Sequence, residues 1–486
     1  MEWSGSVLGW HRWLALGVGP AVLLWCFSGL VMLWVPYPSV TDAEWFVMAG
    51  AIDPALCCAD LEGVMREFDR PEGIAHLRVI AVGGVSIVSA HYLDGSLRAR
   101  QLTAEPVHGP LLTDEMQRVA ESLGLGGSII SIDTIDHDVW TVHQRFDPHR
   151  PLWKAEMAGA SAPVIYLSGT TGEVVQETTA SERRWNLVGA VAHWWYLPWL
   201  RRQWALWDQT LWWVGALSTL MALTGVWLSA SRLLRDGWKG LSGGSRGLHR
   251  LFGMIGGVAA ACWIASGWLS MDHGRWFSDG KVSALERERA MGGRMTTRDV
   301  AGSFGVLSQM AAGGIVKELR LTKIAGTLYA VARESPRHQS ILALARPEEP
   351  AWEEFSDTAV LASVRAMIGE SFPLTVRPNS GQDRRRGSVL AREDLPPVTR
   401  VERQGPSPLS VDVDARTGEI LEILDPSRRA YHGLFILLHR WDVPWFDGHN
   451  DIRRIGMAVW CGLGVGLAVS GFWILARRRL VSKVMQ

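Results

Sequence analysis

Four histidines lie at or near the ends of long apolar segments, where an ionisable side chain is costly and is often functional. His11 and His249 each open such a segment, and His193 and His439 each precede one at the same distance along the sequence. Imidazole is a common axial ligand of haem iron, and non-covalent haem needs two such ligands in an apolar slot. We therefore predict that these four side chains bind haem b as two pairs, with one haem at each face of a membrane.

The pairing follows from an internal repeat. A Ser-Gly motif follows His11 and His249 at one spacing, and a hydroxyl residue with a glycine follows His193 and His439 at another. These motifs are Ser28-Gly29, Ser266-Gly267, Thr224-Gly225 and Ser470-Gly471. Further matches, at offsets of 246 and 242, are Thr171-Gly172-Glu173 with Thr417-Gly418-Glu419, and Leu77 and Gly84 with Leu319 and Gly326. The chain is thus a tandem duplication of span, outer segment and span.

Both copies begin on the same side, so they are parallel repeats related by a pseudo-twofold axis along the membrane normal. This symmetry places the first histidine pair at one depth at the cytoplasmic edge, where the two imidazoles can face each other. The second pair lies on the periplasmic side. His432 and His449 are close enough in sequence to replace His439 as an outer ligand.

Four charge-free stretches are long enough to cross a hydrocarbon core, which makes the chain an integral membrane protein. They are residues 13–34, 209–231, 251–271 and 455–476. Basic residues between the second and third stretches and after the fourth place both termini in the cytoplasm and the two long connections in the periplasm. The predicted organisation of this bacterial inner-membrane protein is transmembrane helix 1 at 11–35, lobe 1 at 36–184, an interfacial segment and helix 2 at 185–231, a cytoplasmic loop at 232–250, helix 3 at 251–271, lobe 2 at 272–430, an interfacial segment and helix 4 at 431–476, and a cytoplasmic tail at 477–486.

The two outer lobes are predicted to be α+β, because short helical patterns alternate with strand-like runs. In the first lobe we expect helices near 60–69 and 114–123, and strands at 75–81, 85–92, 97–102, 139–145, 152–155, 164–167 and 173–176. In the second we expect helices at 297–311 and 357–368, and strands at 317–321, 327–332 and 340–345, with more strands after them. Residues 378–387 are expected to form a solvated loop.

Other features point to less specific roles. A loop with His137, His143 and His149 among acidic residues could hold a metal or meet a ferric chelate, and Cys57-Cys58 could be redox active. The loop's acidic members are Asp133, Asp136, Asp138 and Asp147. The chain has 49 basic and 49 acidic residues, which excludes nucleic-acid binding through bulk charge. No glycine-rich nucleotide motif follows a strand, so electrons must come from quinol or from a partner reductase.

Several motifs are similar to those of a known family. Trp10-His11-Arg12 opens a span that reaches Ser28-Gly29, and Leu248-His249-Arg250 opens its repeat. Strand motifs at 164–173 and 411–419, and the segment 184–195, add to the similarity. Through these residues the chain resembles the PepSY-associated transmembrane family, whose members include inner-membrane ferric-siderophore reductases.

This resemblance implies a four-helix membrane bundle with two periplasmic α+β lobes of PepSY type and b-type haem on span-end histidines. Carried over, the ligands are His11, His193, His249 and His439. The implied activity is an oxidoreductase that passes electrons to a periplasmic ferric chelate. The competing expectation is a non-enzymatic PepSY module that binds or regulates a periplasmic protein or peptidase.

Overall fold

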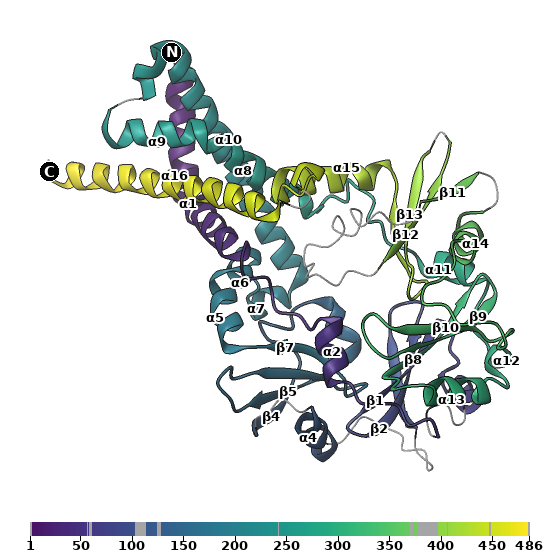
Figure 1. The fold of residues 1–486 in the computed structure, drawn as a ribbon. Helices are drawn as coiled ribbons and strands as arrows, with labels where there is room; N and C mark the ends of the chain where they lie inside the picture. Colours follow the sequence, from purple (N-terminus) through teal and green to yellow (C-terminus); the bar gives the residue numbers. More distant parts are fainter. Residues whose placement is uncertain are drawn as a thin grey trace. The chain divides into compact units, whose positions relative to one another are not determined.

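The computed structural model describes residues 2–55, 57, 61–102, 113–123, 128–241, 243–369, 373–377, 397–405, 407–446 and 449–484. It forms two compact units (Figure 1). The helical unit contains Met1–Tyr37, Ser181–Ser278 and Arg429–Gln486, and the α+β unit contains Pro38–Ala180 and Asp279–Arg428. The α+β unit thus combines the two outer segments of the sequence, and the helical unit combines the remaining parts. The loop expected at 378–387 lies outside the described residues.

Among the described residues, three helices of the helical unit are long and apolar enough to cross a membrane. They are α1 (Glu2–Met32), α8 (Trp204–Asp236) and α16 (Asn450–Val484). Large apolar side chains point outward from them, and Trp213, Leu223 and Trp473 are each more than half exposed. Such exposure on helices of this length fits contact with lipid.

The third predicted span differs from a straight helix. Residues 251–271 belong to α9 (Gly244–Ile255) and α10 (Gly257–Ser270), which are bent by 56° relative to each other. Gly256 lies at the bend, where a Cβ atom would come within 3.0 Å of the Leu463 Cβ on α16. The glycines allow this close approach, and the helix breaks there. If α9 and α10 cross the membrane together as one bent span, they form a fourth span.

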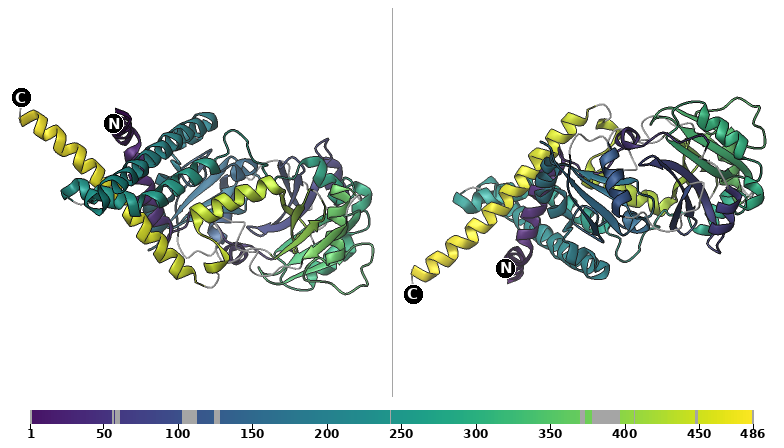
Figure 2. Two further views of the ribbon diagram at one scale, coloured as in Figure 1. Left: turned by 90° about the horizontal axis from the view of Figure 1, so that it is seen from above. Right: turned by 90° about the horizontal axis from the view of Figure 1, so that it is seen from below.

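The helices of this unit pack against one another. Helix α1 contacts α8 and α16, α8 contacts α10, and α16 contacts α9. Figure 2 gives two further views of these helices. Small residues make the contacts close, since a Cβ on Gly215 would lie 3.0 Å from the Trp268 ring.

Two irregular segments lead into α8 and α16. Helix α5 (Ala180–Val188) is followed by the short α6 (Ala190–Trp194) and α7 (Pro198–Arg201), while α15 (Pro426–Leu434) continues as a π-helix over Phe435–Arg440. Both helical stretches end at a tryptophan in the left-handed region, Trp195 with φ 51° and Trp441 with φ 52°. Each repeat also has a proline nearby, Pro198 or Pro444, but the break lies slightly earlier in both, at these tryptophans.

The α+β unit is built on a six-stranded antiparallel sheet shared by both repeats. The strand order is β10-β9-β8-β1-β2-β3. The strands are β1 (Ile74–Val82), β2 (Val85–Tyr92), β3 (Leu97–Leu102), β8 (Glu318–Ile324), β9 (Thr327–Arg333) and β10 (Gln339–Ala343). The two lobes predicted from the sequence are therefore joined, because the edge strand of each three-stranded meander pairs with the edge strand of the other.

Each repeat adds a four-stranded sheet with the same order of strands. The first contains β4 (Ile129–Ile135), β5 (Leu152–Met157), β6 (Val164–Ser168) and β7 (Val174–Thr178), and the second contains β11 (Leu374–Arg377), β12 (Val398–Arg403), β13 (Leu409–Asp414) and β14 (Ile420–Leu424). Helices lie around the sheets: α2 (Asp42–Met48), α3 (Leu61–Phe68), α4 (Thr113–Ser122), α11 (Ala284–Met291), α12 (Thr297–Val300), α13 (Phe304–Ala312) and α14 (Asp357–Ile368).

The six-stranded sheet is apolar on one face. Leu77 and Val79 on β1, and Leu319 and Leu321 on β8, belong to one buried cluster with residues of α3 and α13. The alternate residues of these strands point to the opposite face. There, each four-stranded sheet forms a separate buried cluster with one end of the six-stranded sheet. Charged side chains occupy the middle of that face, at the β1–β8 pair.

Two predicted elements of this unit were wrong. Residues 139–145 form a turn that leads into a 3-10 helix (Gln144–His149), because Asp138 Oδ1 accepts from the Trp140 amide and the Thr141 hydroxyl. The helix expected at 297–311 is two helices, and Gly302, with φ 75°, separates them.

Candidate functional site

The structure brings the four predicted histidines together as two pairs within the helical unit. The ring centroids of His11 on α1 and His249 on α9 are 6.5 Å apart, with an angle of 50° between the rings. The centroids of His193 on α6 and His439 on the π-helix are 6.3 Å apart, with an angle of 70°. His193 therefore faces His439, and neither His432 nor His449 takes that place.

Each ring of the first pair is held by a hydroxyl on a long helix. His11 Nδ1 lies 3.2 Å from Thr224 Oγ1 and 3.1 Å from the Met221 carbonyl oxygen, both on α8. His249 Nδ1 lies 2.9 Å from Ser470 Oγ on α16. The hydroxyl groups of Thr224 and Ser470 donate to backbone carbonyls of their own helices, so their oxygens accept from the imidazoles.

The second pair repeats this arrangement. His193 Nδ1 lies 3.0 Å from Ser28 Oγ on α1, and His439 Nδ1 lies 3.3 Å from Ser266 Oγ on α10. Both serine hydroxyls also donate to carbonyl oxygens of the preceding helical turn. The two Ser-Gly motifs and the two hydroxyl-glycine motifs of the sequence are thus the partners of the histidines.

These contacts fix the tautomer of the rings. Because the hydroxyl protons are given to carbonyls, each Nδ1 carries a hydrogen and donates it. The contacts of the four rings with these hydroxyls, and with the carbonyl oxygens of Met221 and Trp263, all use Nδ1. Nε2 keeps its lone pair and is the nitrogen that a metal can take, in the way that outer hydrogen bonds orient ligand histidines.

The glycine of each motif gives the imidazole its space. A Cβ on Gly225 would lie 2.9 Å from His11 Cε1, and one on Gly471 would lie 3.2 Å from His249 Cε1. Gly267 stands in the same relation to His439 at 3.2 Å, and Gly29 to His193 at 3.7 Å. In each motif the hydroxyl residue therefore orients an imidazole ring, and the glycine after it leaves room for that ring.

The separation within each pair fits two imidazoles on opposite sides of one metal ion. A metal–imidazole bond is about 2.0–2.1 Å long. A ring nitrogen lies roughly 1.1–1.2 Å from the centre of a five-membered ring of ordinary bond lengths. Two rings in trans therefore have centroids about 6.2–6.6 Å apart on these values. The separations of 6.5 and 6.3 Å fall in this range.

Aromatic residues flank the second pair symmetrically. Trp25 contacts Trp195 at 6.3 Å between ring centroids, and the equivalent Trp263 contacts Trp441 at 5.5 Å. The buried Nε1 groups of Trp195 and Trp263 have no acceptor in the described part of the chain. A bound group with carboxylate oxygens, which haem carries, would give such N–H groups a partner. The residues present thus fit haem.

The two pairs are separated along one helix. Both His11 and Ser28, which holds His193, belong to α1. At about 1.5 Å of helix per residue, the interval from His11 to Ser28 spans roughly 26 Å, which is most of the thickness of a hydrocarbon core.

Other predicted residues form no common centre. Among the described residues, no group of three or more His, Cys, Asp or Glu side chains could hold a metal ion. In the acidic loop, His137 Nδ1 contacts Asp136 and His149 Nδ1 contacts the Ser168 hydroxyl. Cys57 is fully buried and disulfide-bonded, and Cys58 lies outside the described residues.

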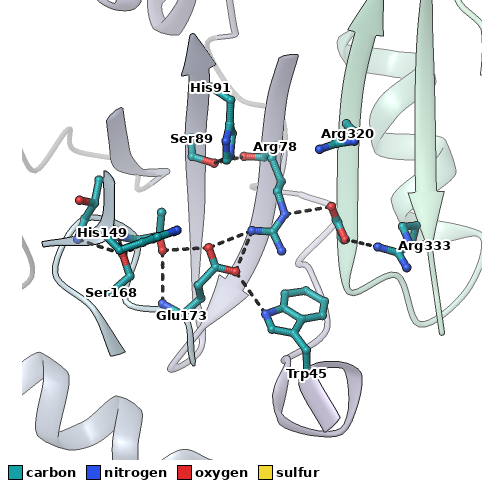
Figure 3. Close-up of polar contacts among 12 residues, drawn as sticks. Trp45, Arg78, Ser89, His91, His149, Ser168, Glu173, Arg320 and Arg333 are labelled. Carbon is teal, nitrogen blue, oxygen red and sulfur yellow. Dashed lines mark hydrogen bonds and ion pairs between the residues drawn. The ribbon is translucent and has the colours of Figure 1, made fainter. Parts of the chain in front are cut away.

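The sequence interpretation missed a charged cluster in the α+β unit (Figure 3). Arg78 contacts Glu173 and Glu318, and Arg333 joins Glu318 to Asp42. Burial alone would raise the pKa of Glu318, but Arg78 and Arg333 lower this pKa to about 2. The repeat gave a signal for the cluster, since arginine follows both Leu77 and Leu319.

No protein-family model matches this sequence, and no curated protein sequence gives a significant match. The resemblance to the PepSY-associated transmembrane family therefore stays a prediction.

Proposed function

We propose that the protein is a membrane electron carrier that binds two haem b groups and delivers electrons to an acceptor on the periplasmic side. The observation that carries this proposal is the pair of imidazole separations, 6.5 and 6.3 Å, each suited to two ligands of one haem iron.

A haem iron with two imidazole ligands supplies reversible one-electron chemistry. His11 and His249 would hold one haem, and His193 and His439 the other. The hydroxyl groups of their motifs keep Nδ1 protonated and Nε2 available. This fixed tautomer and orientation reduce the reorganisation that ligand binding would otherwise need.

The interval of roughly 26 Å along α1 between His11 and Ser28 supports transfer across the membrane, with one pair proposed near each face. The cytoplasmic edge, as predicted from the basic loops, would hold the first pair, and the donor there would be quinol or a partner reductase. The favoured acceptor at the other face is a ferric chelate, because one electron converts Fe(III) to Fe(II) and weakens a chelator that prefers the ferric ion.

The test is the absorption spectrum of the full-length protein purified from haem-replete cells. We expect a b-type spectrum that changes on addition of dithionite, and about two haems per chain. Stopped-flow mixing of the reduced protein with a ferric chelate should then oxidise the haems.

Two outcomes would contradict the proposal at different levels. Colourless protein would contradict haem binding and favour the alternative of a PepSY module that binds or regulates a periplasmic protein. If the protein contained haem but no ferric chelate oxidised it, the electron-carrier proposal would stand and the ferric chelate would be excluded as its acceptor.

A further inference from the structure

The α+β unit contains a pocket of about 320 Å³ beside the β1–β8 pair (Figure 3). Its polar lining includes Arg78, Arg320 and Arg333, and its apolar lining includes Trp45, Val174 and Val175. The predicted histidine ligands belong to the helical unit, so they play no part in this pocket.

Arg78 and Arg320 are equivalent residues of the two repeats. They lie directly opposite each other in the β1–β8 ladder, where the pseudo-twofold axis of this unit must pass. The surroundings of one arginine can therefore be compared directly with those of the other.

Arg78 is paired with two carboxylates. Its Nη1 contacts both oxygens of Glu173 at 2.9 and 2.7 Å, and its Nε donates to Glu318 Oε1 at 2.9 Å. The carboxylates are also satisfied, since Trp45 donates to Glu173 and Arg333 donates to Glu318. Two carboxylates thus neutralise this buried guanidinium.

Arg320 has the same position without these partners. Its Nε is buried and has no acceptor in the described part of the chain. Glu419, the equivalent of Glu173, is 45% exposed and forms an ion pair with Arg320 Nη1 at 3.9 Å, which is too long for a hydrogen bond. The Arg320 side chain is only 14% exposed. A buried guanidinium nitrogen without an acceptor is costly, so a bound group that accepts from Nε would stabilise this arrangement.

The difference arises because the repeats have diverged at two positions. Glu318 and Arg333 form an ion pair in the second repeat, and their equivalents in the first are His76 and His91. The two histidine rings stack at 4.3 Å between centroids. Arg320 Nη2 donates to His76 Nε2 at 2.9 Å, so a neutral ring stands where Arg78 has a carboxylate.

We propose that this pocket binds a small molecule with a single carboxylate, which pairs with Arg320 as Glu173 and Glu318 pair with Arg78. The carboxylate oxygens would accept from the guanidinium, and an apolar body would lie against the lining valines and Trp45. Charged hydrogen bonds of this kind are the strong ones, and the planar guanidinium suits a carboxylate.

The charge of the pocket favours one carboxylate over a polyanion. The lining contains three arginines and three acidic residues, the latter being Asp42, Glu173 and Glu318. There is no excess positive charge to hold a phosphate or a tricarboxylate. Among the described residues, Arg320 Nε has no acceptor. A volume of about 320 Å³ suits a molecule of benzoate size.

Isothermal titration of the full-length protein in nanodiscs with benzoate tests the proposal. Benzamide, which has the same shape without the charge, and sulfate are the comparison ligands. We expect benzoate to bind, and Arg320→Gln to weaken its Kd roughly tenfold to a hundredfold. Arg346→Gln is the matched control, because Arg346 is exposed in the same unit and pairs with Glu349 within its own turn. This variant should bind benzoate as the wild type does.

A second variant keeps the test independent of Arg320. His76→Glu with His91→Arg installs the ion pair of the other repeat, and we expect the new carboxylate to occupy Arg320 and to abolish benzoate binding. Thermal melts should show both variants folded, because neither leaves a carboxylate unpaired. Equal binding of benzoate to wild type and Arg320→Gln would overturn the proposal. So would equal binding of benzamide or sulfate, or no binding of benzoate to the wild type.

Discussion

Alanine at the glycine beside each imidazole tests the histidine geometry. At Gly225 the added Cβ would lie 2.9 Å from His11 Cε1, whereas at Gly29 it would lie 3.7 Å from His193 Cε1. Ordinary contacts between carbon atoms are about 3.5–4.0 Å, so Gly225→Ala must displace His11 by roughly 0.6 Å or more, and Gly29→Ala displaces nothing. Metal–ligand bonds tolerate only about 0.2 Å. We expect Gly225→Ala to lose low-spin haem at one site and Gly29→Ala to keep both haems.

The stability of the two variants should also differ. Alanine is favoured over glycine inside a helix by up to about 1 kcal/mol, whereas overpacking costs about 1–3 kcal/mol. Gly29→Ala should therefore raise the melting temperature slightly, and Gly225→Ala should lower it or leave it unchanged. Gly267→Ala and Gly471→Ala, both at 3.2 Å from an imidazole carbon, should be intermediate.

Haem content by pyridine haemochrome and low-spin signals by electron paramagnetic resonance give the readout, with melting followed on the same samples. If Gly225→Ala and Gly29→Ala retained the same haem content and spectrum, His11 and His193 would have to occupy other positions in the haem-loaded protein, and the geometric reasoning would fail.

Three further predictions concern single side chains. His11→Ala and His249→Ala should each remove the same haem, and the double variant should lose no more haem than either single one; a further loss would show separate sites. Arg78→Gln removes the cation that pairs with the buried Glu173 and should cost roughly 3–5 kcal/mol of stability, against about 0–1 kcal/mol for the exposed Arg232→Gln; equal melting temperatures would refute this. Burial, and then the nearby arginines, lower the pKa of His91 to about 3, so its contribution is fully present above pH 6.5 and is lost as pH falls from 6.5 toward 3. His91→Phe should then reduce the pH slope of stability there by about 1.4 kcal/mol per unit, and an unchanged slope in thermal melts would contradict it.

Much of the helical unit follows from its sequence pattern. Charge-free length locates the helices, and equal spacing in the two repeats is enough to pair His11 with His249 and His193 with His439. The bend at Gly256 was missed because it depends on how closely α16 approaches, which hydropathy does not encode. The left-handed Trp195 and Trp441 were missed for a similar reason, since proline is the stronger local signal for a break.

The α+β unit shows where sequence reasoning ends. Its strands were mostly predicted, but the pairing of β1 with β8 joins Arg78 to Arg320, far apart in the chain, and no local pattern specifies such a register. Without that register Arg78 and Arg320 are two ordinary strand arginines. With it they face each other, and the difference between their surroundings becomes visible.

The two units therefore use the duplication in opposite ways. In the helical unit both copies keep a histidine, a hydroxyl that holds its Nδ1, and a glycine that admits the ring. In the α+β unit the equivalents of Glu318 and Arg333 are His76 and His91, so one arginine is hydrogen-bonded to two carboxylates and the other to a histidine. An electron path across a membrane needs a similar centre near each face, which a duplicated site provides. A single ligand that binds near a twofold axis instead needs a site in which the two repeats differ. The retained pairs and the broken pair thus agree with two haem sites in one unit and one carboxylate site in the other.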